Sequence, residues 1–185
     1  MKTPIEFSIE LKKAVHAGLN ILLEGPFGVG KSSIIFSVAE ELGLRMKYFS
    51  ASTLDPFADL VGVPVPVMED QTRRLIYVRP DYIQQAEILF FDELNRAHPK
   101  VLNAVFEIIQ FHSINGETLP HLRSVIAAIN PASAGYHVQE LDPALLDRFH
   151  LHLHVAFEPN LETTLRKRDA EPGAARRPSA LIVTP

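Results

Sequence analysis

The sequence contains no cysteine and no tryptophan, and it has no apolar run long enough to span a bilayer. The lack of cysteine excludes disulfide bonds and thiolate metal sites. The N-terminus, MKTPIEFSIELKK, is amphipathic and carries acidic residues, unlike a secretory signal peptide. These absences predict a cytoplasmic protein with no membrane partner.

Basic charge is also not in excess, since the formal net charge is -4. This balance argues against a domain whose whole surface binds nucleic acid non-specifically. With 185 residues, 46% of them hydrophobic, the chain is long enough for one domain with a full core. We predict a globular core at residues 1–158 and a tail at 159–185, because the end of the chain is rich in Arg, Pro and Ala without a sustained period.

Short apolar runs alternate with segments of helical periodicity, a pattern that predicts an α/β fold. Several runs are continuously apolar, as expected for parallel strands buried on both faces. The predicted strands are Asn20–Gly25, Met46–Ala51, Glu87–Asp92, Ser124–Asn130 and His150–Phe157, and the predicted helices are Ile5–Gly18, Lys31–Gly43 and Pro99–Gln110.

A glycine-rich segment, GPFGVGKS, lies between the first predicted strand and the second predicted helix and fits the phosphate-loop pattern G-x-x-x-x-G-K-[ST]. Its glycines permit a turn that points backbone N–H groups inward, and the following helix adds its positive end. The alternative is an ordinary glycine-rich turn. We predict that the loop binds the phosphates of ATP, with Lys31 on the β and γ phosphates and Ser32 on Mg²⁺. The predicted nucleotide-binding residues are Gly25, Pro26, Phe27, Gly28, Val29, Gly30, Lys31, Ser32 and Ser33.

Two carboxylates, Asp92 and Glu93, directly follow the apolar run ILFF. Ligands bind at the carboxyl ends of strands in α/β sheets. Asp92 is suited to hold Mg²⁺ together with Ser32, and Glu93 is suited to act as a general base toward water. The alternative is a solvated acidic pair that caps the helix beginning at Pro99.

The motifs GPFGVGKS, FFDELNRAHPK, AAINPA and ELDPALLDRF follow one another in the order and spacing of the AAA+ ATPases, and most closely resemble the MoxR-like and dynein-related branch. The match covers about residues 5–158. The resemblance implies a P-loop NTPase fold, a three-layer sandwich with five parallel strands flanked by helices. It also implies a ring-forming oligomer, expected to be a hexamer, whose ATP site is completed by the neighbouring subunit.

In this resemblance Asn130 is similar to the sensor-1 residue, which orients the attacking water or senses the γ phosphate. Arg148 is similar to the arginine finger, whose guanidinium stabilises charge on the γ phosphate bound by an adjacent protomer. The structural alternatives are a helix-capping asparagine and an arginine paired with Asp142 or Asp147. Arg96 is a candidate for a second arginine at a subunit interface.

Two hairpins are expected as inserts. VPVPVMEDQTRRLIYV has two β-prone runs around a polar turn at Glu69–Thr72, and Asn115-Gly116 is a strong tight-turn signal. In the family such inserts contact substrates or partners, although plain surface hairpins are an equal alternative.

Three histidines, His150, His152 and His154, alternate along the last predicted strand. A strand would place them on one face, where they could bind Zn²⁺. We favour an exposed edge strand instead, with Leu151, Leu153 and Val155 facing the core. A Ser-His-Asp hydrolase is disfavoured because no G-x-S-x-G motif occurs.

The family carries a helical lid after the fifth strand, and EPNLETTLRKR resembles only its start. We therefore interpret residues 159–185 as a vestigial lid followed by a disordered tail, either because the gene product is truncated or because another segment supplies the lid.

The leading hypothesis is an ATP-hydrolysing, Mg²⁺-dependent oligomer that remodels a partner protein, for which a von Willebrand A-type domain is one candidate. One alternative is a nucleotide-binding interaction module with little turnover. Another is a DNA-directed, restriction-type NTPase, which no extended basic stretch supports.

Overall fold

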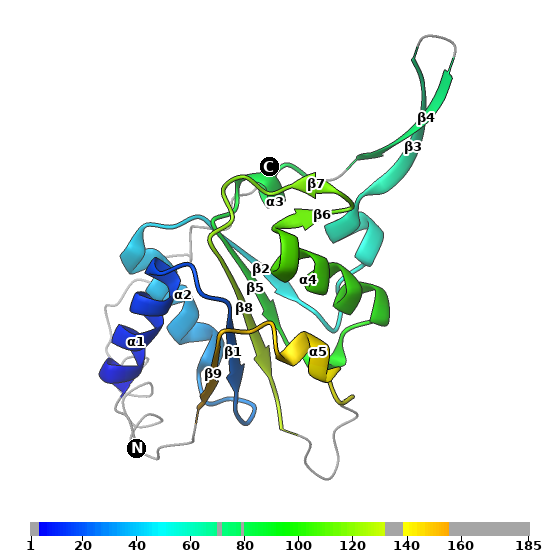
Figure 1. Ribbon diagram of the computed structural model, residues 1–185. Coiled ribbons are helices and arrows are strands. Elements are labelled where there is room, and N and C mark those ends of the chain that lie inside the picture. Colours follow the sequence, from blue (N-terminus) through cyan, green and yellow to red (C-terminus); the bar gives the residue numbers. More distant parts are fainter. Residues whose placement is uncertain (1–3, 70–71, 79, 132–138, 156–185) are drawn as a thin grey trace, which may run out of the picture.

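The computed structural model describes residues 4–69, 72–78, 80–131 and 139–155. Its centre is a parallel sheet of five strands in the order β2-β5-β8-β1-β9 (Figure 1). The predicted α/β class is therefore confirmed. The strands are β1 (Ile21–Glu24), β2 (Met46–Ser50), β5 (Ile88–Asp92), β8 (Ser124–Ile129) and β9 (Leu151–His154).

The last strand is shorter than predicted. It pairs with β1 only over four residues, from Leu151 to His154, instead of running from His150 to Phe157. His150 precedes the ladder, and its ring accepts a hydrogen bond from the backbone N–H of Asn20 at 2.9 Å. Phe157 and the predicted lid start and tail at 159–185 lie outside the described residues.

Helices cover both faces of the sheet, which makes the predicted three layers (Figure 1). Helices α1 (Pro4–His16) and α2 (Lys31–Leu42) lie on one face, and α4 (Pro99–Phe111) lies on the other. Successive strand residues point to opposite faces, so each strand supplies two cores. Toward α1 and α2 the sheet buries Ile21, Leu23, Ile88, Phe90, Ile126 and Ala128, and toward α4 it buries Leu22, Leu89, Phe91, Val125 and Ala127.

Local signals in the sequence explain where the main helices begin and end. Gly43 ends α2 in the left-handed conformation, with φ 65°, as predicted from its position. Pro99 opens α4, and the preceding His98 ring accepts a hydrogen bond from the backbone N–H of Lys100 at 3.1 Å. The alternative in which the acidic pair caps this helix is therefore wrong, because His98 is the capping residue.

Both predicted hairpins are present. β6 (Ser113–Ile114) and β7 (Glu117–Thr118) flank Asn115 and Gly116, which both adopt positive φ as the tight turn requires. The larger hairpin joins β3 (Val63–Glu69) to β4 (Thr72–Val78) and projects from the body of the molecule (Figure 1). It follows a π-helical segment, η1 (Pro56–Val61).

The remaining elements are short: α3 (Tyr82–Gln85), η2 (Leu94–Arg96) and α5 (Pro143–Leu146). Of the helices in the described parts of the chain, none has the length and apolar character needed to cross a bilayer.

Candidate functional site

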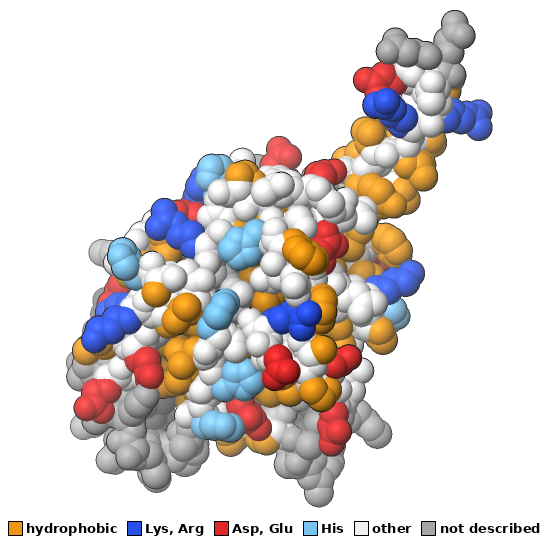
Figure 2. Space-filling model, viewed as in Figure 1, with side chains coloured by type: hydrophobic (Ala, Val, Ile, Leu, Met, Phe, Trp, Pro, Cys, Tyr) orange, Lys and Arg blue, Asp and Glu red, His pale blue; other side chains and the backbone are white. Residues whose placement is uncertain are grey.

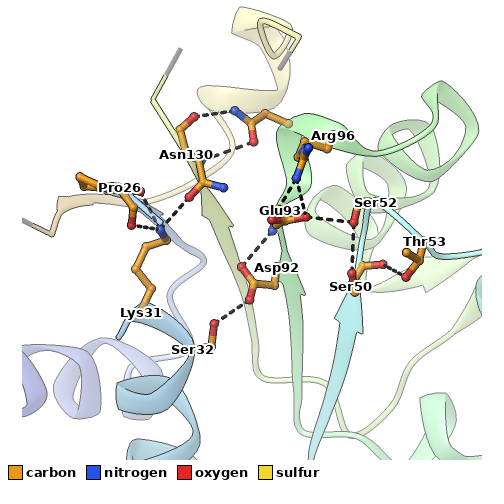
Figure 3. Close-up of polar contacts among 12 residues, drawn as sticks. Pro26, Lys31, Ser32, Ser50, Ser52, Thr53, Asp92, Glu93, Arg96 and Asn130 are labelled. Carbon is orange, nitrogen blue, oxygen red and sulfur yellow. Dashed lines mark hydrogen bonds and ion pairs between the residues drawn. The ribbon is translucent and has the colours of Figure 1, made fainter. Parts of the chain in front are cut away.

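The carboxyl ends of β1, β5 and β8 meet at one edge of the sheet, and the loops that leave them enclose an open cavity of about 480 Å³ (Figure 3). This is the edge at which α/β sheets bind ligands. Most of the residues predicted to bind nucleotide, Mg²⁺ or water line it: Phe27, Gly28, Gly30, Lys31, Ser32, Ser33, Asp92, Glu93 and Asn130, joined by Tyr48 and Ser50.

The glycine-rich loop takes its shape from two kinds of glycine. Gly28 and Gly30 have φ of 80° and 85°, a conformation that side chains disfavour. Gly25 is required for space, because a Cβ there would overlap the carbonyl oxygen of Val155 at the end of β9. Within the loop Val29 is buried, whereas Phe27 is 77% exposed at the mouth of the cavity.

Lys31, at the first turn of α2, reaches across the loop and is buried (Figure 3). Its Nζ donates to the carbonyl oxygens of Gly25 and Pro26 at 2.6 and 2.9 Å, and to Oδ1 of Asn130 at 2.9 Å. Burial lowers the pKa of Lys31, while the negative charges of Asp92 and Glu93 act in the opposite direction. A buried ammonium group whose contacts are mostly neutral oxygens suits a phosphate ligand, which would supply the missing negative charge.

Ser32 and Asp92 meet across the cavity although they are 60 positions apart, with Ser32 Oγ donating to Asp92 Oδ2 at 2.6 Å. The other carboxylate oxygen of Asp92 accepts from the backbone N–H of Glu93 at 3.0 Å. A hydroxyl and a carboxylate oxygen are ligands that suit Mg²⁺, which is commonly held by one or two protein groups together with substrate phosphates. The donor set therefore fits a phosphate-bound Mg²⁺ ion.

Glu93 is held in a fixed position beside this pair. Its backbone is left-handed, with φ 55°, and Ser52 donates to its Oε2 at 3.0 Å. Arg96 donates to both of its carboxylate oxygens at 3.2 Å (Figure 3). Arg96, predicted as a candidate interface residue, thus contacts the acid of its own chain.

The sequence prediction missed Asn95, which positions Asn130. Asn95 is buried, and its side-chain amide donates to the carbonyl of Asn130 at 2.7 Å. Asn130 follows the end of β8 and turns its own side chain to Lys31. The signal for Asn95 was present, because a polar residue between Leu94 and Ala97 in a buried segment needs a partner.

Arg148 is the one predicted catalytic residue that does not line the cavity as far as its described lining extends. Its guanidinium donates to Gln110 and to the carbonyl of Ala144, and it stacks on the Phe106 ring at 3.8 Å. These contacts place it against α4 and α5. Its role toward nucleotide stays a prediction.

The three alternating histidines have separate neighbours, and that of His150 is Asn20. His152 lies 3.0 Å from the carbonyl of Leu146, and His154 lies 3.4 Å from the Glu24 carboxylate. Leu153 is buried against α1 and α2, with Leu151 and Val155 partly buried beside it, as predicted for an edge strand.

Comparison with known proteins agrees with this fold. Midasin from Giardia intestinalis is 26% identical over 154 residues, which cover 80% of this chain and 3% of Midasin. The Holliday junction branch migration complex subunit RuvB from Gluconobacter oxydans is 30% identical over 156 residues, covering 80% of this chain and 40% of RuvB. The chain therefore spans less than half the length of either relative.

A crystal structure of a proposed ATPase from Cytophaga hutchinsonii has the same fold, with a TM-score of 0.64 and 22% identity over 89% of this chain and 50% of that protein. Residues 20–149 match the AAA domain family, dynein-related subfamily. This range contains the phosphate loop, the acidic pair, Asn130 and Arg148, so the chain belongs to the dynein-related subfamily of the AAA+ ATPases.

Proposed function

We propose that this chain binds ATP with Mg²⁺ in the cavity at the sheet edge and hydrolyses it. The observation that carries the proposal is the contact of Ser32 with Asp92 at 2.6 Å, beside the buried ammonium group of Lys31. Groups suited to phosphate and to a metal ion thereby converge on one open cavity, Lys31 and Ser32 from α2 and Asp92 from the end of β5.

Five polar residues of the cavity have a proposed role. Lys31 and the loop N–H groups hold the phosphates, and Ser32 and Asp92 hold Mg²⁺, which neutralises phosphate charge when bound. Glu93 accepts the proton of the attacking water, and its contacts with Ser52 and Arg96 orient its carboxylate. Asn130 orients that water from the end of β8.

Binding is tested first with Lys31→Ala, measured by titration calorimetry with Mg-ATP. We expect affinity to fall by about tenfold or more, because a charged hydrogen-bond donor to phosphate is lost. Lys47→Ala is the matched control, since Lys47 is partly buried but lies over Tyr82, 3.6 Å from the ring centre, and outside the lining of the cavity. Equal affinity in the two variants contradicts the nucleotide site.

Turnover is proposed to require an oligomeric ring, expected to be a hexamer, in which Arg148 serves the nucleotide of the adjacent chain. The ring would remodel a partner protein, and a von Willebrand A-type domain is the candidate partner. Support comes from family membership and from the position of Arg148 against α4 and α5. If ATP binds but steady-state hydrolysis is undetectable at any protein concentration, the alternative of a nucleotide-binding interaction module holds.

A second candidate function is a DNA-directed motor, because RuvB is among the relatives. Gel-shift measurements with duplex and branched DNA at moderate salt discriminate it. Binding that persists when Mg-ATP is present would favour the DNA-directed function, whereas no shift favours a protein partner.

A further inference from the structure

The β3–β4 hairpin exposes apolar side chains on both of its faces. Figure 2 shows them gathered along the part of the hairpin nearer the body, with charged groups at its far end. The exposed residues are Val63, Val65, Met68, Leu75, Ile76 and Val78. A two-stranded hairpin is by itself only marginally stable in water, and three or more strands are needed for independent stability. This surface is therefore suited to be covered by additional strands.

The two edges of the hairpin differ. Pro64 and Pro66 of β3 lie directly opposite Tyr77 and Leu75 of β4. Proline has no N–H to donate across a ladder, so these two pairs are non-hydrogen-bonded pairs of the hairpin. The backbone N–H and C=O groups of their residues point away from the hairpin. The outer edge of β3 therefore lacks two donors, whereas the outer edge of β4 has N–H and C=O groups at both Leu75 and Tyr77.

This asymmetry restricts how copies of the chain can associate through the hairpin. A head-to-tail array would join the β4 edge of one copy to the β3 edge of the next, and the two prolines oppose it. Pairing of β4 with β4 uses the open edge of both copies and stops at two, as a two-fold interface does. The result is a four-stranded sheet.

The sequence of β4 is compatible with antiparallel pairing to itself. With Leu75 opposite Leu75 of the second copy, Arg73 lies opposite Tyr77, and an arginine beside an aromatic ring is favourable. The two Arg73 residues are then four positions apart, about 14 Å. The charge of Arg74 is already paired with Glu69 at 2.9 Å. A register that centres on Arg74 would instead place like charges opposite each other, which is unfavourable.

We propose that the β3–β4 hairpin is a homotypic interaction surface, at which β4 pairs antiparallel with β4 of a second copy of this chain around Leu75. The pairing is independent of nucleotide binding, because it uses backbone groups of the projecting hairpin and none of the residues that line the cavity.

Cysteine cross-linking in the full chain tests the geometry, since the natural sequence has no cysteine. Leu75 and Met68 are similarly exposed, at 64% and 67%, and lie on the two different strands. Leu75→Cys should form disulfide-linked dimers under mild oxidation, because only the two-fold pairing brings position 75 next to itself. Met68→Cys should not. Equal cross-linking at the two positions, or none at position 75, overturns the proposal.

Sedimentation of two variants at position 75 tests whether the outer edge of β4 pairs through its backbone groups. Leu75→Pro removes the outward N–H of residue 75 from both copies. The hydrogen bonds between β3 and β4 remain, because Pro66, directly opposite, shows that this pair contributes none to the hairpin. Leu75→Thr removes the apolar side chain and keeps the N–H. We expect the proline variant to weaken dimerisation by at least about tenfold more than the threonine variant. Equal weakening means that apolar packing alone holds the dimer and overturns strand pairing, with circular dichroism and Mg-ATP affinity as folding controls.

Discussion

In the cavity Lys31 meets Asn130 across 99 positions of sequence, whereas in the β3–β4 hairpin every residue pairs within the same short segment. The cavity exists only when β1, β5 and β8 are already aligned, and its polar groups satisfy one another. The hairpin needs no such alignment and leaves its apolar side chains exposed. The groups that line the cavity therefore depend on the global fold, whereas the hairpin can form without that fold.

The largest effect is expected at Arg148, which lies against α4 and α5, outside both the cavity lining and the hairpin. An Arg148→Ala chain should bind Mg-ATP almost normally and lose about 10³- to 10⁵-fold in turnover, because an arginine finger stabilises transition-state charge. Mixing it with Lys31→Ala chains should recover activity, since some interfaces then combine an intact loop with an intact arginine.

Arg123→Ala is the control, because Arg123 pairs with Glu87 at 2.9 Å away from the cavity lining. Steady-state ATPase rates at several protein concentrations give the result. Activity that is independent of concentration down to the monomer, or unaffected by Arg148→Ala, refutes a role in trans.

The next largest effect separates chemistry from binding within the cavity. Glu93→Gln keeps the size of the side chain and its contacts with Ser52 but removes the proton acceptor, so turnover should fall by about 10²- to 10⁴-fold while ATP still binds. Asp92→Asn should instead change the Mg²⁺ concentration needed for activity. Glu41→Gln on the exposed side of α2 is the control, and wild-type turnover in Glu93→Gln would mean that another group is the base.

A smaller effect, on stability, distinguishes the two kinds of glycine in the loop. Gly25→Ala should lower the free energy of unfolding by about 1–3 kcal/mol, since the new Cβ overlaps the Val155 carbonyl and β9 must shift. A Cβ at position 28 would have no neighbour within 4 Å. Gly28→Ala should therefore lower the free energy of unfolding through the positive φ alone, by about 1–2 kcal/mol.

Gly28→Asn should be milder than Gly28→Ala, because asparagine tolerates the left-handed conformation, whereas Gly25→Asn should be at least as harmful as Gly25→Ala. Urea unfolding of the four variants measures this. If asparagine rescued position 25, backbone conformation rather than close packing would be the reason for that glycine.

The smallest effect is expected in the hairpin. Ile76→Thr, at a position that is 46% exposed, should change the free energy of unfolding by no more than about 0.5 kcal/mol. Leu23→Ala in the buried sheet should cost about 2–5 kcal/mol. Chemical denaturation at low protein concentration measures the free energy of unfolding of both variants, and calorimetry measures their Mg-ATP affinity. A large loss of stability in Ile76→Thr would show that the hairpin is not separable from the core.

Much of the architecture could be predicted because residues that are close together in the sequence specify it. Apolar runs gave the strands, Gly43 and Pro99 gave helix ends, and Asn115-Gly116 gave a tight turn. The phosphate loop and the acidic pair were found for the same reason, since the residues of each motif are adjacent in the chain. The predicted end of β9 at Phe157 is wrong, because the length of this strand is set by its pairing with the four residues of β1 and not by apolar character.

The α/β class, the loop at Gly25–Ser32 and the carboxylates at Asp92 and Glu93 can thus be predicted from residues that are adjacent in the chain. The contacts of Asn95 with Asn130 and of Arg96 and Ser52 with Glu93, and the lack of room for a side chain at Gly25 beside Val155, are visible only in the folded structure. Those contacts join residues from different elements, and they exist only after the strand order has brought the elements together. Local periodicity carries no information about that order, which depends on how the strands and the helices on both faces of the sheet pack together.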